Sequence, residues 1–245
     1  MSSGTCVVSA PYRTPPATGC AAPSRFWLPN APSAAVAEPM CPARHALKII
    51  ASMPQSSPER LSSRGGEVSG IALRDWAGLL TRRFGAQAVD VVRQTAELGP
   101  EALPECPAKA AWFPVATQLR LTSATLQLFL GNDLTALAAL LEAETLGTVD
   151  RAKRRLLQLT VRPTLAFKAT PKIYASLYRP GAANASVKGR WAEVSWTGAD
   201  FQCEPIWQAL QVVALGAMFK TLGYPRAEIE VVAPVAEGFA VQARW

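Results

Sequence analysis

The chain has 245 residues, with 25 Lys and Arg against 18 Asp and Glu and a single histidine, His45, which gives a net charge of +7 and an isoelectric point near 9.4. One histidine argues against most imidazole chemistry, because His is the commonest general base and a frequent metal and haem ligand. A hydrophobic share of 49% and a charged share of 18% are those of a globular protein with few charges.

The first 65 residues differ from the rest of the chain. They contain ten of the 20 prolines, a density that disfavours helices and central strands. They also carry six basic and two acidic residues, so the remaining 180 residues are nearly neutral. We therefore predict a disordered, proline-rich tail over residues 1–65 and one folded domain over residues 66–245. Met40 and Met53 leave open that the natural start lies downstream of Met1.

Targeting and redox features predict a cytoplasmic protein. No apolar stretch typical of a secretory signal follows the start, and no run of about 18 apolar residues predicts a membrane span. The cysteines are odd in number and contain no CxxC, which favours reduced thiols. They are Cys6, Cys20, Cys41, Cys106 and Cys203. A role for Cys203, which directly precedes a predicted buried helix, stays open.

The first half of the domain has helical periodicity. Ser69 is placed to cap a helix that runs to about Phe84, with apolar residues at steps of three and four, and Gly85 ends it. Further helical patterns cover 86–97, 113–130, 134–146 and 148–162 and are separated by Gly and Pro breaks. In the last of these we expect Leu156, Leu157 and Leu159 to face inward.

The character changes after Pro163. Residues 164–178 predict one or two short helices around Pro171, and residues 187–196 have strand-type side chains with poor alternation. A nearly all-apolar helix is predicted over 205–222, with Pro205 at its first position and Gly223 past its end. Residues 229–245 alternate as a hairpin with a loop at 234–238. The fold class is therefore α+β, a single domain with a helical N-terminal half followed by antiparallel strands packed on a buried helix.

The sequence offers no catalytic or metal site. Ser/His/Asp and Cys/His sites need a base beside the nucleophile, and zinc needs several close ligands. No phosphate-binding glycine loop is present. Glu142 and Glu144 do not face each other on a helix, so we expect both to be solvated surface. We predict no enzyme, no metal and no cofactor. A cleft in which Asp200 or Glu204 meets Arg190 would favour an enzyme instead.

The densest basic cluster lies in the predicted helix 148–162. Arg151, Arg155 and Arg162 fall on one face and could contact phosphate or an acidic partner. The alternative is the solvated side of a helix, whose C-terminal cations suit the helix dipole. Nucleic acid is disfavoured because no aromatic-interleaved basic strand or recognition-helix motif accompanies the cluster.

Tryptophan is abundant in residues 66–245. Core packing explains such residues as a rule, because Trp carries a large apolar surface and one N–H. The functional alternative is an apolar ligand cavity, since such pockets are mostly aromatic. Its candidate lining residues are Trp191, Trp196, Trp207, Met218 and Phe219. The sequence leaves both interpretations open.

Short motifs in a fixed order carry a family resemblance over residues 68–245. They are Val68–Leu73 with Arg83–Gly85, Trp112–Pro114, Phe129–Asp133, Ala169–Tyr174 with Tyr178 and Gly181, and Gly238–Trp245. With these motifs the chain resembles a myxobacterial-type paralogous family of uncharacterised proteins. That family is similar in turn to the ligand-binding α/β domains of the haem-nitric-oxide-sensor, four-vinyl-reductase and TRAPP-subunit group.

The resemblance implies a sensor-like or docking domain whose interior can hold an apolar ligand. Haem sensors of the group hold iron through a histidine, and residues 66–245 contain none. Four-vinyl-reductase domains tend to close with a cysteine in their last strand, and Gly238–Trp245 has none. Haem ligation and thiol chemistry are therefore not carried over.

The functional prediction is a non-enzymatic, cytoplasmic module for signalling or regulation. It would bind a small apolar ligand or a protein partner. The alternative is a structural adaptor or homodimerisation module without a small-molecule ligand.

Overall fold

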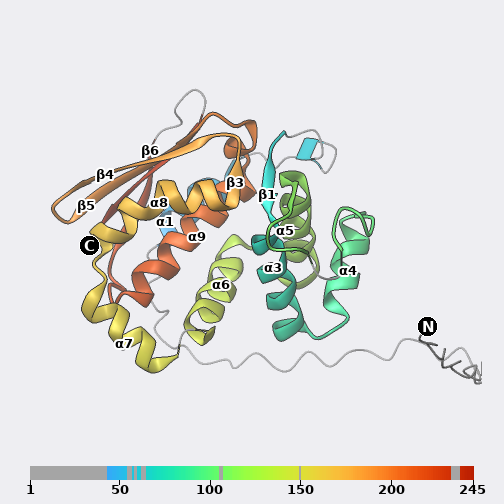
Figure 1. Cartoon of the computed structure of the whole chain (residues 1–245), viewed down its shortest axis with the longest axis horizontal. Coiled ribbons are helices and arrows are strands. Elements are labelled where there is room, and N and C mark those ends of the chain that lie inside the picture. Colours follow the sequence, from blue (N-terminus) through green and yellow to red (C-terminus); the bar gives the residue numbers. More distant parts are fainter. Residues whose placement is uncertain are drawn as a thin grey trace, which may run out of the picture. The chain divides into compact units, whose positions relative to one another are not determined.

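A computed structural model describes residues 43–53, 57, 60–61, 65–104, 107–148, 150–232 and 238–245. The chain divides into two compact units, Met1–Glu38 and Pro39–Trp245, and every described residue belongs to the second. This unit contains helices and two antiparallel sheets, so the predicted α+β class is confirmed. Figure 1 shows the arrangement of its elements.

The N-terminal half of the unit is mainly helical, as predicted. It contains β1 (Glu67–Ser69), α3 (Gly70–Phe84), α4 (Ala88–Thr95), β2 (Trp112–Pro114) and α5 (Val115–Phe129). Ser69 caps α3, because its hydroxyl oxygen accepts the backbone N–H of Ile71 over 3.3 Å. The predicted stripe of α3 is buried at Leu73, Trp76, Leu79 and Leu80.

Three helices follow along the chain: α6 (Leu134–Thr148), α7 (Arg151–Thr160) and α8 (Pro163–Leu177). The cap of α7 is Asp150, whose side chain accepts the N–H of Ala152 over 3.3 Å, so α7 begins later than the predicted 148. Pro171 lies inside α8, which forms one helix rather than two.

The larger sheet has the strand order β4-β5-β7-β6, and every pair is antiparallel. Its strands are β4 (Ala182–Lys188), β5 (Trp191–Thr197), β6 (Glu228–Val232) and β7 (Gly238–Arg244). The predicted C-terminal hairpin is confirmed, although most of its loop lies outside the described residues. The predicted strand 187–196 is wrong, because it spans the turn at Gly189 and Arg190 between β4 and β5. That turn explains the poor alternation.

The smaller sheet has the order β2-β1-β3, where β3 is Tyr178–Arg179. Val68 of β1 pairs with Phe113 of β2 on one side and with Tyr178 of β3 on the other. This sheet therefore joins the N-terminal helices to the C-terminal half.

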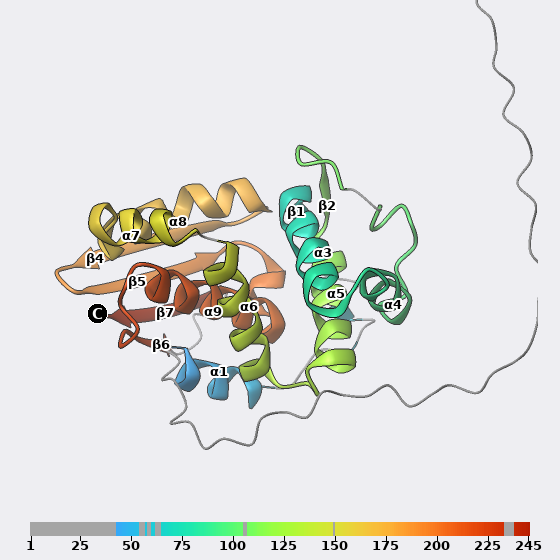
Figure 2. The same cartoon turned by 90° about the horizontal axis from the view of Figure 1, so that it is seen from below.

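The predicted buried helix is α9 (Pro205–Thr221), which follows the short 3-10 helix η1 (Asp200–Cys203). Thirteen of its residues are buried. Trp207 of α9 meets Trp196 of β5 edge to face, with ring centroids 5.8 Å apart. Figure 2 shows α6 between α9 and the helices α3 and α5. The core thus lies around α9.

The prediction of a helix-free tail over residues 1–65 is wrong for α1 (Arg44–Ala51). Ala46, Leu47 and Ile50 of α1 are buried, and α1 packs against α9 and β6. The residues between Pro42 and Pro54 contain no proline and have apolar side chains at helical spacing, a local pattern that the proline density of the whole segment hides. His45 therefore belongs to this unit, on the exposed face of α1. The remaining predictions for residues 1–42 lie outside the described residues.

Candidate functional site

A groove of about 390 Å³ separates α3 from α6. On α3 the lining residues Ala72, Trp76 and Leu79 follow the four- and three-residue steps of one helix face. On α6 the lining residue Leu141 is followed one turn later by Glu144 and Thr145. The complete lining is Ala72, Asp75, Trp76, Leu79, Arg82, Leu141, Glu144 and Thr145. Helical periodicity thus places an apolar floor and a polar rim in one groove.

The floor is held in place by Trp76. Its side chain is buried, and its indole N–H donates to the hydroxyl of Thr125 on α5 over 3.4 Å. This bond satisfies the one polar group of the ring. The groove therefore offers Trp76, Leu79 and Leu141 as an apolar surface.

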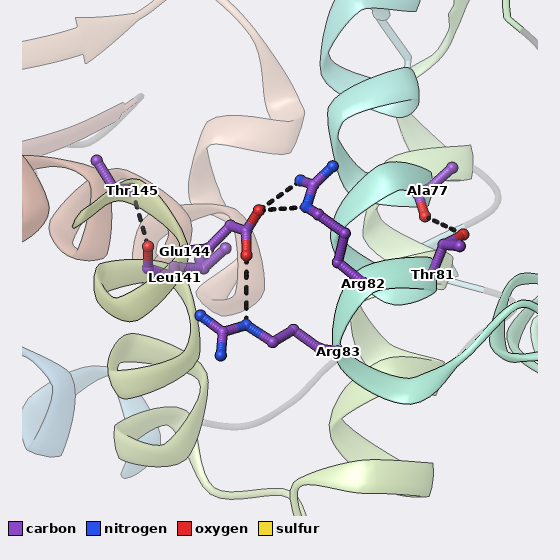
Figure 3. A network of polar contacts seen from close by, with 7 residues as sticks. All are labelled: Ala77, Thr81, Arg82, Arg83, Leu141, Glu144 and Thr145. Atoms are coloured by element: carbon purple, nitrogen blue, oxygen red, sulfur yellow. Dashed lines mark hydrogen bonds and ion pairs between the residues drawn. The ribbon is translucent and has the colours of Figure 1, made fainter. Parts of the chain in front are cut away.

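The rim is closed by an ion-pair cluster, which Figure 3 shows. Arg82 donates through Nε to Oε1 of Glu144 over 2.6 Å, and its Nη2 lies 2.5 Å from the same oxygen. Arg83 donates through Nε to Oε2 over 3.3 Å. The Glu144 side chain is only 14% exposed, whereas those of Arg82 and Arg83 are 54% and 38% exposed. One carboxylate therefore ties the last turn of α3 to α6.

The second carboxylate of α6, Glu142, pairs with α9 rather than with α3. Glu142 is buried and accepts a hydrogen bond from Lys220 on α9. The prediction that Glu142 and Glu144 are solvated surface is therefore wrong, although the two do not face each other, as expected. Buried carboxylates are paired as a rule, and each of these has its cation on a neighbouring helix.

A second groove, of about 370 Å³, lies among α6, α7, α8 and α9. Its lining is almost wholly apolar and includes Leu157, Ala166, Ala214 and Met218. Thr145 borders both grooves. Met218 is the one ligand-pocket candidate from the sequence among the residues that line this groove.

The structure does not gather the five predicted pocket residues. Trp196 and Trp207 are buried against each other, and Phe219 packs on Phe167 of α8 and on the C-terminal Trp245. Trp191 is five positions before Trp196 on β5, so it points to the opposite, partly exposed face of the sheet. Trp196, Trp207 and Phe219 therefore form packed core, consistent with the simpler interpretation.

Two tyrosines border this aromatic core. The Tyr174 hydroxyl donates to the carbonyl of Pro180 over 2.8 Å and accepts from the Gln202 amide over 2.7 Å. Burial raises the pKa of Tyr174 to about 12, against the opposing effect of the Gln202 bond. Burial also raises the pKa of Tyr178. Both phenols are therefore neutral at ordinary pH, and the contacts of Tyr174 are structural.

The predicted basic residues lie on two elements. Arg151 and Arg155 are exposed on α7, whereas Arg162 is exposed at the cap of α8, because backbone of extended conformation separates the helices. The expected inward position of three α7 leucines is wrong for two of them. Leu156 is 60% and Leu159 is 85% exposed. Leu157 alone faces the second groove.

Neither a cluster of metal ligands nor a single membrane-spanning helix is found in the part of the chain that the structure describes. No group of three or more His, Cys, Asp or Glu residues there could hold a metal ion. None of the described helices is by itself long and apolar enough to cross a membrane, and the one pair that reaches that length together, α5 and α6, is bent by 104°.

Comparison with known proteins by sequence gives no relative. No family model matches the chain, and no curated protein matches it significantly. The myxobacterial-type family resemblance therefore stays a prediction.

Comparison with solved structures gives a shared fold. One solved structure comes from work on modulating haem redox potential through protein-induced porphyrin distortion. It covers 72% of this chain and 99% of its own, with a TM-score of 0.51 and 11% identity. An unliganded Fe(II) H-NOX protein from K. algicida has a TM-score of 0.46 and 16% identity over 71% of this chain and 94% of its own. An oxygen-binding H-NOX domain related to soluble guanylate cyclases has a TM-score of 0.47 and 10% identity over 72% and 94%.

Haem does not fit the residues of the candidate site. Proteins hold haem iron through His, Cys, Met or Tyr, and none of these types lines the groove between α3 and α6. The one histidine of the chain is exposed on α1, and the Tyr174 hydroxyl is engaged with Pro180 and Gln202. The described residues share their fold with a structure from work on haem. The side chains that line this groove, however, include none of the types that ligate haem iron.

The groove residues escaped the sequence prediction, although one feature pointed to them. Residues 134–148 are apolar except for threonines and the two carboxylates Glu142 and Glu144. A charge in so apolar a helix requires a partner. Arg82 and Arg83, cations in the last turn of the amphipathic helix 70–84, are the partners of Glu144.

Proposed function

We propose that residues 43–245 form a non-enzymatic, sensor-like module that binds a small apolar ligand in the groove between α3 and α6. The observation that carries this proposal is the groove itself, with an apolar floor of Trp76, Leu79 and Leu141 under a polar rim. Binding pockets for small molecules have this composition, mostly apolar with a few fixed polar groups. Its volume of about 390 Å³ suits a small ligand.

The position of the groove supports a sensing role. It lies where α3, from the N-terminal half, faces α6, which is also tied to the central helix α9. A ligand between α3 and α6 would change the separation that the Glu144 ion pairs set. A ligand that binds one separation better than another shifts the population between them.

Nile red, a neutral apolar dye, tests the groove in the full chain. Ala72→Trp fills the groove from α3, and Ala143→Trp places the same side chain on the exposed face of α6 as the control. We expect Ala72→Trp to weaken dye binding at least fivefold and Ala143→Trp to leave it unchanged. Equal binding by both variants would overturn the site.

Native mass spectrometry and solvent extraction of the purified chain separate the two functional candidates. A co-purifying apolar compound supports the sensor, whereas a ligand-free, stable dimer favours the structural adaptor. A Soret absorption band would contradict the conclusion that haem does not fit. The cytoplasmic location and the absence of enzymatic activity stay predictions, because these measurements address the ligand and the oligomeric state.

A further inference from the structure

The most exposed large apolar side chains of the described chain gather in one short segment. Leu156, Leu159, Leu165 and Ile173 are 60%, 85%, 60% and 52% exposed, and no other large apolar residue that the structure describes exceeds 42%. All four lie on α7 and α8; α7 lies at the lower left edge of the unit in Figure 1, and both helices lie along its upper left side in Figure 2. Exposed apolar residues that cluster in one segment indicate an interaction surface, whereas single exposed leucines are ordinary.

The geometry of α7 explains the exposure. At about 100° per residue, Ala152, Leu156 and Leu159 form one stripe. The opposite side holds the helix on the protein, because Leu157 lines the second groove and Gln158 donates to the carbonyl of Thr221 over 3.3 Å. None of the residues of α7 is buried. The leucine stripe therefore faces away from the unit.

Positive charge surrounds this stripe. By the same helical geometry, Arg151 and Arg155 lie on one side of it and Lys153 on the other. Arg162, Lys168 and Lys172 continue the charge along α8, and all six are exposed. Residues 151–192 contain ten Arg and Lys and no Asp or Glu, so the remainder of the chain is net negative. Six of these ten cations are the exposed residues of α7 and α8 named above.

We propose that this α7–α8 face, the four exposed apolar residues with their six basic neighbours, docks on an anionic lipid bilayer surface. Leu156 and Leu159 would enter the boundary between headgroups and acyl chains, and the flanking cations would contact lipid phosphates. An apolar stripe between basic flanks is the pattern of helices that lie in a membrane interface. Anionic headgroups also attract cations close to the surface.

The same observations favour lipid over a macromolecular partner. The leucines protrude from a helix that is exposed along its length, and a fluid bilayer accommodates protruding side chains without a matching cavity. A nucleic acid would satisfy the cations, but it would leave the leucines in water. An acidic protein with a complementary apolar groove is the other outcome that the experiment must detect.

Co-sedimentation of the full chain with vesicles tests the proposal. We expect binding to vesicles of three parts phosphatidylcholine and one part phosphatidylglycerol, weak binding to pure phosphatidylcholine, and a decrease with added salt. Leu156→Ser with Leu159→Ser leaves the charge unchanged and should weaken binding by about tenfold or more, since each leucine loses apolar burial. Leu128→Ser on α5, where Leu128 is 39% exposed, is the control.

A second pair of variants tests the charges. Arg151→Glu with Arg155→Glu should weaken binding to the anionic vesicles by about 25-fold or more, at roughly fivefold for each lost cation. Lys109→Glu with Arg226→Glu makes the same change in net charge at exposed positions elsewhere and should leave binding nearly intact. Circular dichroism and the thermal midpoint confirm that these surface variants stay folded.

Insertion has its own readout. Vesicles that contain brominated lipid should quench the tryptophan fluorescence of Leu159→Trp more strongly than that of the wild type, because the new indole would lie in the bilayer interface. Absence of binding to anionic vesicles would overturn the proposal. So would binding that the leucine variant retains, because the apolar stripe would then take no part. Leucine-dependent binding to an acidic protein from a pull-down, without binding to vesicles, would overturn it in favour of a protein partner.

Discussion

Glu142 and Glu144, two residues apart on α6, bind cations on opposite sides of that helix. Glu142 accepts from Lys220 on α9, and Glu144 is paired with Arg82 and Arg83 on α3. The α6 helix is therefore held to both halves of the unit by two carboxylates that lie two residues apart. The two pairs differ in exposure, which makes their contributions to stability separable.

Glu144→Gln should lower the free energy of unfolding by about 1 kcal/mol, because both arginines are partly exposed and recover water contacts. Urea denaturation measures the change. Glu97→Gln, which removes an ion pair whose carboxylate is 82% exposed, is the matched control and should cost less than about 0.5 kcal/mol. A larger loss of unfolding free energy for Glu97→Gln than for Glu144→Gln would show that exposure does not determine how much each ion pair contributes to stability.

Glu142→Gln should cost more, about 3 kcal/mol, because it leaves the Lys220 ammonium without its carboxylate in a site where the Lys220 side chain is 16% exposed. Urea denaturation again gives the value. Glu142→Leu with Lys220→Met, which removes both charges together, should be milder than Glu142→Gln alone. A double variant as unstable as the single one would contradict the unpaired-charge explanation.

Trp207→Ala should lower the free energy of unfolding by about 3–5 kcal/mol, since its fully buried ring packs on Trp196, Tyr178 and Phe201. Met218→Ala should cost clearly less, because Met218 borders an open groove and is only partly buried. Thermal and urea unfolding compare the two. Equal losses would mean that Met218 is also packed core.

Local patterns were enough to predict much of this fold. The cap Ser69, the apolar stripe after it and Gly85 define α3 within the sequence itself, and Pro205 with Gly223 does the same for α9. These features depend on neighbours within a few residues. The alternation in β6 and β7 has the same local origin.

The features that the sequence did not predict are the α1 helix, hidden by an average over a long segment, and the ion pairs, which join residues far apart in the chain. The α1 helix was hidden because proline density was averaged over 65 residues, while residues 43–53 contain none. The pairing of Glu144 with Arg82 joins residues 62 positions apart, and Glu142 and Lys220 are 78 apart. No periodicity reports which helices approach each other, so the groove could not be derived from the sequence.

Gly238→Ala should destabilise the unit by about 2 kcal/mol or more, because the added Cβ would lie 2.2 Å from the carbonyl oxygen of Trp196 on the adjacent strand. The contact is with backbone, which cannot move without breaking the β5–β7 pairing. Gly147→Ala in α6 is the control, since a Cβ there meets nothing within 4 Å, and it should stabilise by about 0.5–1 kcal/mol. Thermal unfolding of both variants checks the opposite signs.

Alkaline pH should weaken the fold through Tyr174. Its pKa is raised from 10.0 to about 12 by burial, so between these values the folded state keeps a proton that the unfolded state releases. Stability must then fall as pH rises, by up to about 1.4 kcal/mol for each pH unit. Tyr178, whose pKa is also raised, adds an effect of the same sign.

Tyr174→Phe isolates the contribution of that residue. The variant loses the bonds to Pro180 and Gln202 and should be about 1–2 kcal/mol less stable at neutral pH. Between pH 9 and pH 11, however, the free energy of unfolding of the variant should fall by about 1 kcal/mol less than that of the wild type, because the variant lacks one phenol whose pKa differs between the folded and unfolded states. Urea denaturation at both pH values measures the difference. Parallel losses would show that Tyr174 titrates alike in the folded and unfolded chains, because only a difference in its pKa between the two states can make its removal change the slope.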